Sequence, residues 1–246
     1  MPTSEGGDSN GDLCGDPNGD VSGDSSGDFM TGAEVAAALK EFDQVLTAPL
    51  DDIIAPHQQA LADPSRIERW RLPEADRAAL IRWGLPNSSG GLFDVDFQDA
   101  VRTGTEFPGE HLYGLVKYRS EARVVAVAGT GAVYMLPPPP MNTEEAAEFR
   151  RRNPELFAAH RKKNPEFPYR APSLFNSSVS LFVDAYWRYE RAAQVLRKLI
   201  LGADPFDAAC LDDVADRLDA FVEWVRSVDP PAAEDGAQWR EITEDW

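Results

Sequence analysis

The sequence predicts an α+β fold in which helices cover a small, mainly antiparallel sheet. Two observations support this prediction. Apolar residues recur at helical spacing near both ends of the folded part, whereas residues 92–136 form a series of short strands separated by turn residues. Helices that precede and follow a block of strands gather on one face or at one end of an antiparallel sheet. A chain of 246 residues, 43% of them hydrophobic, can form one such domain.

Residues 1–30 differ in composition from the rest of the chain. Gly-Asp pairs recur every four residues from Gly7-Asp8 to Gly27-Asp28, and the segment has seven acidic side chains without a Lys or Arg. Such a segment has too few apolar residues to bury a core. We therefore expect a disordered acidic leader at residues 1–30 and a single domain over residues 31–246.

Capping and turn residues predict the first elements of this domain. A capping box at Thr31-Gly32-Ala33-Glu34 opens a helix with an apolar face. Pro73 opens a short helix, which Gly84 can end in the left-handed conformation. We expect strands at 92–97, 113–118, 123–128 and 132–136, with a turn at Gly129-Thr130-Gly131 between the last two.

Four prolines at 137–140 end the last predicted strand, because proline cannot donate a hydrogen bond to a neighbouring strand. We expect a Pro-rich, partly helical insertion at about 141–172, in which Asn-Pro-Glu at 153–155 and at 164–166 each fits a helix start. Two longer amphipathic helices then run from Ser177 to about Leu201 and onward from Asp204-Pro205. We expect the apolar face of each of these two helices to pack against the sheet.

The formal net charge of −18 restricts the partners of the protein. An acidic surface disfavours DNA, RNA and anionic membranes and attracts basic partners over a long range. No apolar run reaches the ~18 residues of a membrane helix, and the first residues lack a signal-peptide pattern, so we expect a cytoplasmic protein. Cys14 and Cys210 lie in unlike settings, which favours two reduced thiols.

The sequence shows no motif for catalysis or for metal binding. A Gly-x-Ser-x-Gly nucleophile turn is absent, and a calcium loop starting at Asp16 would need Gly and Glu where Val21 and Gly27 stand. None of the histidines lies three to five residues from another histidine or from a cysteine: His57, His111 and His160. We therefore expect no cofactor, no metal ion and no small-molecule substrate.

Two features leave alternatives open. Asp94 and Asp96 would project from the same side of a strand, where they could hold a hard cation, meet a basic partner or face solvent. The basic triplets at 150–152 and 161–163 could touch phosphates as one stripe on a continuous helix. A proline after each triplet breaks that helix, and compensation of helix C-terminal charge explains the triplets, so we expect no direct binding of nucleic acid.

Three stretches, in this order and spacing, resemble one family of proteins. Leu72-Pro73, Leu80-Ile81 and Gly84-Leu85-Pro86 are similar to its opening helix and turn, and residues 124–136 are similar to its central hairpin. Phe175-Asn176-Ser177-Ser178 looks like its Asn-Ser-Ser helix start, and Asp229-Pro230 with Trp239 and Ile242 resembles its ending. The family is the SUKH (SMI/KNR-like) superfamily, in particular the fourth SUKH immunity group of bacterial polymorphic toxin systems. The resemblance covers roughly residues 65–246; the leader and the insertion depart from it.

The resemblance implies a SUKH-like fold and a protein that binds a cognate toxin stoichiometrically and silences it without acting as an enzyme. Toxins of such systems are often nucleases or nucleic-acid deaminases, so a basic partner fits the acidic net charge. Residues chosen by sign and strand or loop position as partner contacts are Asp94, Asp96, Glu106 and Glu110. The alternatives are a SUKH-type scaffold module without a toxin partner, or a metal-dependent hydrolase built on Asp94 and Asp96.

Overall fold

The computed structural model describes residues 29–87, 93–101, 107, 110–118, 122–137, 148, 151–155, 158, 172–202, 208–234 and 237–244. The leader predicted at 1–30 lies outside these residues except for its last two positions. Most of the insertion predicted at about 141–172 also lies outside them. Both features therefore stay predictions, whereas the helices and strands of the remaining chain can be compared with the structure.

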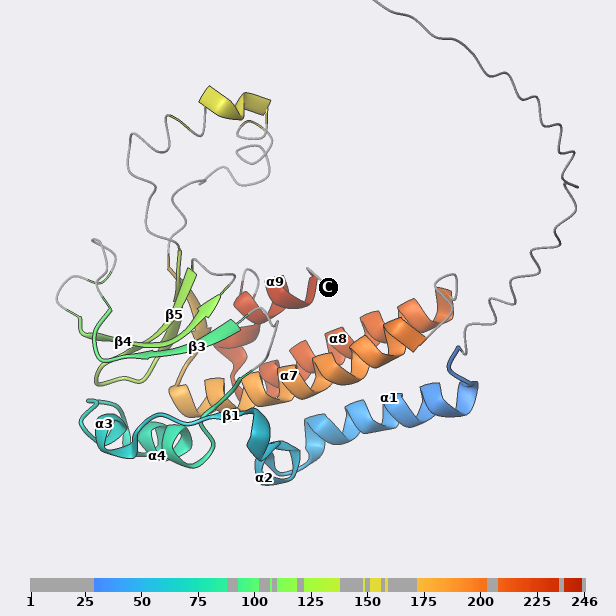
Figure 1. Cartoon of the computed structure of the whole chain (residues 1–246), viewed down its shortest axis with the longest axis horizontal. Coiled ribbons are helices and arrows are strands. Elements are labelled where there is room, and N and C mark those ends of the chain that lie inside the picture. Colours follow the sequence, from blue (N-terminus) through green and yellow to red (C-terminus); the bar gives the residue numbers. More distant parts are fainter. Residues whose placement is uncertain are drawn as a thin grey trace, which may run out of the picture.

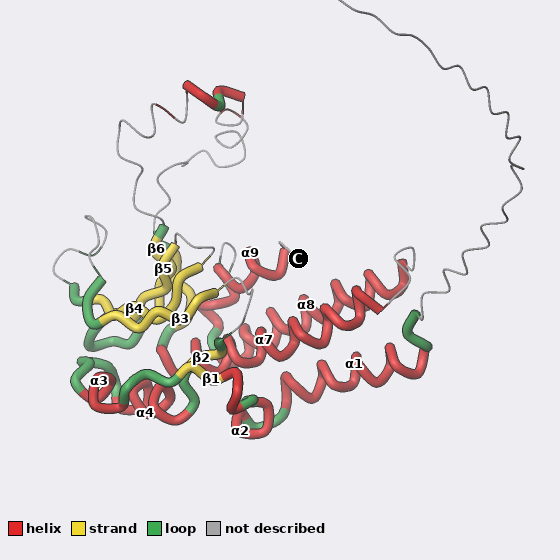
Figure 2. The backbone as a smooth tube through the Cα atoms, viewed as in Figure 1, coloured by secondary structure: helices red, strands yellow, loops and turns green. Residues whose placement is uncertain are grey.

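Five strands form one antiparallel sheet in the order β3-β4-β5-β6-β7 (Figures 1 and 2). They are β3 (Phe93–Gln98), β4 (Leu112–Tyr118), β5 (Ala122–Val127), β6 (Val133–Leu136) and β7 (Ser173–Asn176). A separate antiparallel pair consists of β1 (Gln59–Ala60) and β2 (Leu85–Pro86). The predicted α+β class is confirmed, and β3 to β6 agree with the four predicted strands to within one residue at each end.

Three long helices lie alongside one another and extend past the sheet (Figure 1): α1 (Gly32–Thr47), α7 (Val179–Gly202) and α8 (Ala208–Val228). Helix α7 is central. Its first half lies against the sheet with α4 (Glu74–Arg82) beside it, and its second half packs against α1 and α8. The shorter elements are α2 (Leu50–Ile53), η1 (Pro56–Gln58), α3 (Pro64–Glu68), η2 (Pro230–Ala233) and α9 (Gln238–Glu244).

Helix α1 begins at the predicted capping box. The Thr31 backbone N–H donates to Glu34 Oε2 at 2.7 Å, and the Glu34 N–H donates to Thr31 Oγ1 at 3.4 Å. The bond from the Thr31 backbone is the main reason why the pKa of Glu34 lies below its ordinary value. The side chains of Ala38, Phe42 and Val45 form the buried face of this helix.

Aromatic rings fill the junction between the sheet, α7 and α9. Phe93 of β3 lies with its ring centroid 4.8 Å from that of Tyr186, and Phe175 of β7 lies 4.8 Å from Trp239. Phe182 contacts Phe175 at 5.2 Å. All five side chains are fully buried. Because each ring of this size removes roughly 150–250 Å² from water, this cluster stabilises the contact between the two layers.

Strand β7 was not predicted. The Asn-Ser-Ser motif predicts a helix from Ser177, but Asn176 belongs to β7, which pairs with β6, and α7 begins at Val179. The buried carboxylate of Asp229, beyond α8, accepts hydrogen bonds from Asn176 Nδ2 at 2.9 Å, from the Ser177 N–H at 2.8 Å and from Ser177 Oγ at 2.6 Å. These bonds join residues more than fifty positions apart, so no local pattern reveals them.

Glycine turns follow the prediction. Gly84 has a φ of 55° after α4, and Gly129 and Gly131 have φ values of 89° and 74° between β5 and β6. A Cβ on Gly131 would lie 1.9 Å from Asp76 Oδ2. Asp76 is buried, and its other oxygen accepts the Ser180 N–H of α7 at 2.8 Å. A side chain at position 131 would therefore collide with the carboxylate of Asp76, which belongs to α4 and caps the N-terminal end of α7.

None of the helices in the described part of the chain combines the length and the hydropathy needed to cross a bilayer.

Candidate functional site

The strand β3 presents two different faces. Phe93 is fully buried, and Val95 and Phe97 are partly buried against the main core. Asp94 lies opposite Lys117 in the β3–β4 register, and Asp96 binds the same Lys117 side chain, so both carboxylates lie on the opposite side of the strand, although the register shifts between Val95 and Gln98. This confirms that the two carboxylates share one face of the sheet, namely the outer face, which points away from α7.

A polar network crosses the outer face from β3 to β5. Asp96 Oδ2 lies 3.0 Å from Lys117 Nζ and accepts a hydrogen bond of 2.5 Å from Gln98 Nε2. Arg123 Nη1 donates to Gln98 Oε1 at 2.6 Å. Lys117 also lies opposite Asp94 in the β3–β4 register. The charge of Asp96 is thus largely compensated within the sheet, whereas the Asp94 side chain is exposed to solvent.

The structure brings together only part of the predicted contact set. Glu110 is exposed, but it precedes β4. It lies seven residues before Lys117, which is the residue opposite Asp94 in the β3–β4 register. At about 3.3 Å per residue this separation is roughly 23 Å along the strand. Glu106 lies outside the described residues. Asp94 and Asp96 therefore form one site at the edge of the sheet, and Glu110 belongs to the other end of the same strand pair.

Asp99 directly follows β3 and connects this end of the strand to α3. Its Oδ1 accepts hydrogen bonds from Arg66 Nε at 2.7 Å and from Trp70 Nε1 at 2.9 Å. These two bonds, together with the positive charges of Arg66 and Arg69, hold the pKa of Asp99 below its ordinary value. His111 Nε2 lies 2.7 Å from the Asp99 carbonyl oxygen. The segment leading from β3 is therefore held in place by several polar contacts.

The rest of the outer face is apolar, which the sequence analysis missed. Leu112, Val125 and Leu136 are buried in a second, smaller cluster with two further valines, and Phe107 and Tyr134 pack against it. Strand β5 reads Val124-Val125-Ala126-Val127, a continuous apolar run. Such a run is typical of a strand that is covered on both faces. That signal could have predicted the second cluster.

Helix α8 carries an acidic stripe that the sequence analysis also missed. We define the α8 stripe by four exposed side chains, which follow one another at intervals of four, three and four residues: Asp212, Asp216, Asp219 and Glu223. Residues at these intervals share one helix face. Glu223 is paired with Arg226, and Arg217 Nε, between the acids, lies 3.2 Å from Asp43 of α1. The spacing alone could have identified this stripe.

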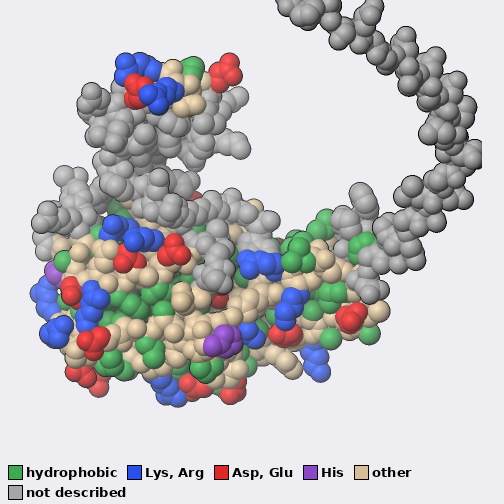
Figure 3. All heavy atoms as spheres, viewed as in Figure 1, with side chains coloured by type: hydrophobic (Ala, Val, Ile, Leu, Met, Phe, Trp, Pro, Cys, Tyr) green, Lys and Arg blue, Asp and Glu red, His purple; other side chains and the backbone are tan. Residues whose placement is uncertain are grey.

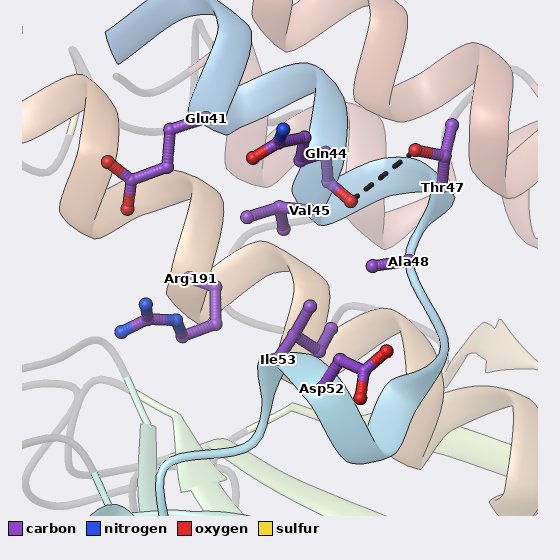
Figure 4. Close-up of a pocket in the computed structure, with 8 residues that line it drawn as sticks. All are labelled: Glu41, Gln44, Val45, Thr47, Ala48, Asp52, Ile53 and Arg191. Carbon is purple, nitrogen blue, oxygen red and sulfur yellow. Dashed lines mark hydrogen bonds between the residues drawn. The ribbon is translucent and has the colours of Figure 1, made fainter. Parts of the chain in front are cut away.

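A cavity of about 320 Å³ opens between α1, α2 and α7 (Figure 4). Its apolar floor is formed by Val45, Ala48 and Ile53, and charged side chains from three helices surround it (Figure 4). Arg191 Nη1 donates to Gln194 Oε1 at 2.8 Å, while its Nε is buried and has no hydrogen-bond partner among the described residues. The cavity could accept a small polar side chain, but no imidazole or thiol lines it.

Among the residues that the structure describes, no group of three or more His, Cys, Asp or Glu side chains could hold a metal ion. Asp94 and Asp96 therefore have no third ligand within that part of the chain, and Asp96 is already bound to Lys117. His57 and His111 are described and lie on different elements, whereas His160 lies outside the described residues. Cys210 is a buried free cysteine.

Charged side chains of both signs are spread over the face seen in Figure 3, with apolar side chains between them. No single-sign patch dominates that view. The acidic excess of the chain thus lies in separate places, including Asp94, Glu110 and the α8 stripe.

Comparison with known proteins places the chain in a family. The model of the SUKH-4 immunity protein family matches residues 45–245, which includes every strand and most of the helices. No curated protein and no solved structure matches the chain. The matched region starts near the end of α1 and reaches α9, so it contains the whole sheet and the buried Asn176–Asp229 contact. The chain therefore belongs to the SUKH-4 immunity protein family.

Proposed function

We propose that this protein binds a cognate bacterial toxin and neutralises it by stoichiometric occlusion. The observation that carries the proposal is the family match over residues 45–245. An inhibitor of this kind needs a rigid surface, not a reactive group. The buried aromatic junction and the central helix α7 supply such rigidity. The proposal assumes that the protein and its toxin meet in the cytoplasm.

The proposed partner is basic and acts on nucleic acid, as a nuclease or a deaminase. The net charge of −18 supports this choice, because proteins that bind nucleic acid surround their substrate groove with Lys and Arg. An acidic inhibitor would approach such a groove faster by electrostatic steering, by roughly 10- to 1000-fold at low salt. The steering comes from the summed field of the protein and does not need every carboxylate to touch the toxin.

Four acidic residues remain the proposed contributors: Asp94, Asp96, Glu106 and Glu110. Among them Asp94 is the strongest candidate for direct contact, because it is exposed while Asp96 is bound to Lys117. Asp96 would contribute less charge to such a contact than Asp94, because Lys117 already compensates it. Glu110 is exposed at the other end of the strand pair and would contribute to steering.

Co-expression with the toxin candidate encoded by the neighbouring gene tests the proposal. Cell survival and recovery of the complex are scored, the latter at about 50 mM and about 500 mM salt, over which the screening length falls severalfold. We expect survival and a complex that weakens at high salt. Survival without a complex, or neither survival nor complex, would contradict stoichiometric occlusion, and the latter result would favour the scaffold function.

A further inference from the structure

The two edges of the five-stranded sheet are not equivalent. At one edge, η2 and α9 pack along β7. At the other edge, β3 pairs with β4 on one side, and no described strand pairs with its other side. An edge strand presents a row of backbone N–H and C=O groups that another strand can use. In the described part of the chain, the side of residues 94–97 that faces away from β4 is therefore the candidate pairing edge, and it is short and irregular because the β3–β4 register shifts between Val95 and Gln98.

The side chains of β3 define what kind of strand would fit beside it. On the outer face the nearest neighbours of an added strand would be Asp94 and Asp96. On the inner face they would be Val95 and Phe97, which remain partly exposed. Side chains directly opposite one another in a sheet interact, and opposite charges or apolar pairs stabilise the pairing. A strand with alternating basic and apolar residues matches both faces.

We propose that β3 receives a strand of the toxin, whose basic side chains lie against Asp94 and Asp96 and whose apolar side chains lie beside Val95 and Phe97. This inference rests on the proposed toxin-binding function and specifies its contact. Backbone hydrogen bonds would supply affinity, and the alternation of side chains would supply specificity, as in other cases of strand addition.

The charges around β3 favour this occupant over others. Lys117 lies one strand further into the sheet and is bound to Asp96, and Arg123 lies two strands away on Gln98. Neither cation occupies the side on which a new strand would arrive. A second copy of β3 would place acidic side chains against acidic side chains, which destabilises a sheet. The acidic residues 1–28 would meet the same repulsion. A basic strand would instead place opposite charges beside Asp94 and Asp96.

Hydrogen exchange of the full chain, free and bound to the toxin encoded by the neighbouring gene, tests the inference. The amides of β3 that do not bond to β4 should exchange at least about tenfold more slowly in the complex, because they acquire new partners. The amides of β7 serve as an internal control, since that edge is already covered. A stable, inhibitory complex with unchanged exchange throughout β3 would refute strand addition and leave the proposed function intact.

A pair of charge reversals gives an independent readout. Asp94→Lys should raise the dissociation rate of the toxin complex about tenfold or more, because it places like charges side by side within the paired strands. Asp212→Lys, at an exposed position of the α8 stripe, changes the net charge equally and should alter mainly the association rate. Equal dissociation rates for the two variants would overturn the inference. Failure of the unmodified chain to bind at all would instead refute the proposed function.

Discussion

Asp229 shows how a single buried residue organises this fold. Its carboxylate accepts three hydrogen bonds from Asn176 and Ser177, and Asn176 Oδ1 in turn accepts one from Trp239 Nε1 at 3.0 Å. These contacts join the end of β7, the loop after α8 and helix α9. The Asn-Ser-Ser and Asp-Pro motifs that resemble the family thus have a shared structural role.

Asp229→Ala should therefore destabilise the protein by about 3 kcal/mol or more, because it leaves several buried donors without an acceptor. The free energy of unfolding in denaturant measures the effect. Glu223→Ala, an acidic position on the exposed face of α8, is the matched control and should stay within about 0.5 kcal/mol of the unmodified protein. Similar losses for the two variants would show that the Asp229 contacts do not hold these elements together.

Two glycines of one turn provide a second comparison at the residue scale. Gly129 and Gly131 both have positive φ, so alanine at either position carries a strain of about 1–2 kcal/mol. Only at Gly131 would the new methyl group also overlap the Asp76 carboxylate, whereas nothing lies within 4 Å at Gly129. Gly131→Ala should thus lower the thermal midpoint clearly more than Gly129→Ala. Equal shifts would contradict the close packing of Asp76 against this turn.

The pKa of Asp99 predicts a pH dependence. Because hydrogen bonds from Arg66 and Trp70 lower this pKa in the folded state, ionised Asp99 stabilises the fold. The contribution is present above the pKa of the unfolded chain, about 4, and is lost as the pH falls through the lower folded value. Asp99→Asn should reduce stability at pH 7, and its difference from the unmodified protein should shrink below about pH 4. A difference that is constant from pH 7 to pH 3 would contradict this linkage.

At the scale of the elements, Arg188 of α7 connects three helices. It donates to the carbonyl oxygens of Val45 at 2.5 Å and of Ala48 at 3.0 Å, and so caps the C-terminal end of α1. Its guanidinium also lies over the Trp224 ring of α8, 4.8 Å from the centroid, and its Nε donates to Asp184 at 2.9 Å. Burial raises the pKa of Asp184, although Arg188 opposes the shift.

Arg188→Met should loosen α1, since it leaves the carbonyls that end this helix without a donor. We expect a loss of at least about 2 kcal/mol in the free energy of unfolding and faster hydrogen exchange in α1. Arg217→Met removes a more exposed arginine that also joins α8 to α1, through Asp43, and should cost less than about 1 kcal/mol. Unchanged exchange in α1 for Arg188→Met would show that other contacts dock this helix.

The elements that could be predicted from the sequence are those with local signals. The capping box of α1, the glycine that ends α4, the hairpin of β5 and β6 and the long stripes of α7 and α8 all follow from residues close together in the chain. Strand β7 and the covered outer face of the sheet depend on contacts with distant segments, and short elements such as α3 and α9 carry too few residues for a periodic pattern. For these elements, contacts with distant segments rather than the local sequence determine the structure.

The candidate site was predictable to a similar extent. Alternation along β3 placed Asp94 and Asp96 on one face, as the structure confirms. The ion pair that compensates Asp96 and the separation of Glu110 could not be foreseen, because both depend on the register between β3 and β4. Sequence alone therefore placed the two carboxylates on one strand but could not separate the exposed carboxylate from the compensated one.

At the scale of the whole molecule, the chain has a net charge of −18, and the family match over residues 45–245 assigns it to immunity proteins. An inhibitor that acts by binding, as proposed here, is limited in its effect on a toxin by its own amount. An enzyme that inactivated the toxin would not have this limit. The number of toxin molecules silenced per chain thus separates the two kinds of mechanism.

The most direct test is a titration of a cognate toxin candidate with this protein, at a toxin concentration well above the dissociation constant. The activity of the toxin should fall linearly and end at one chain per toxin molecule, and it should return when the complex is dissociated. Complete inactivation by a small fraction of an equivalent, or no inhibition at several equivalents, would contradict neutralisation by stoichiometric binding.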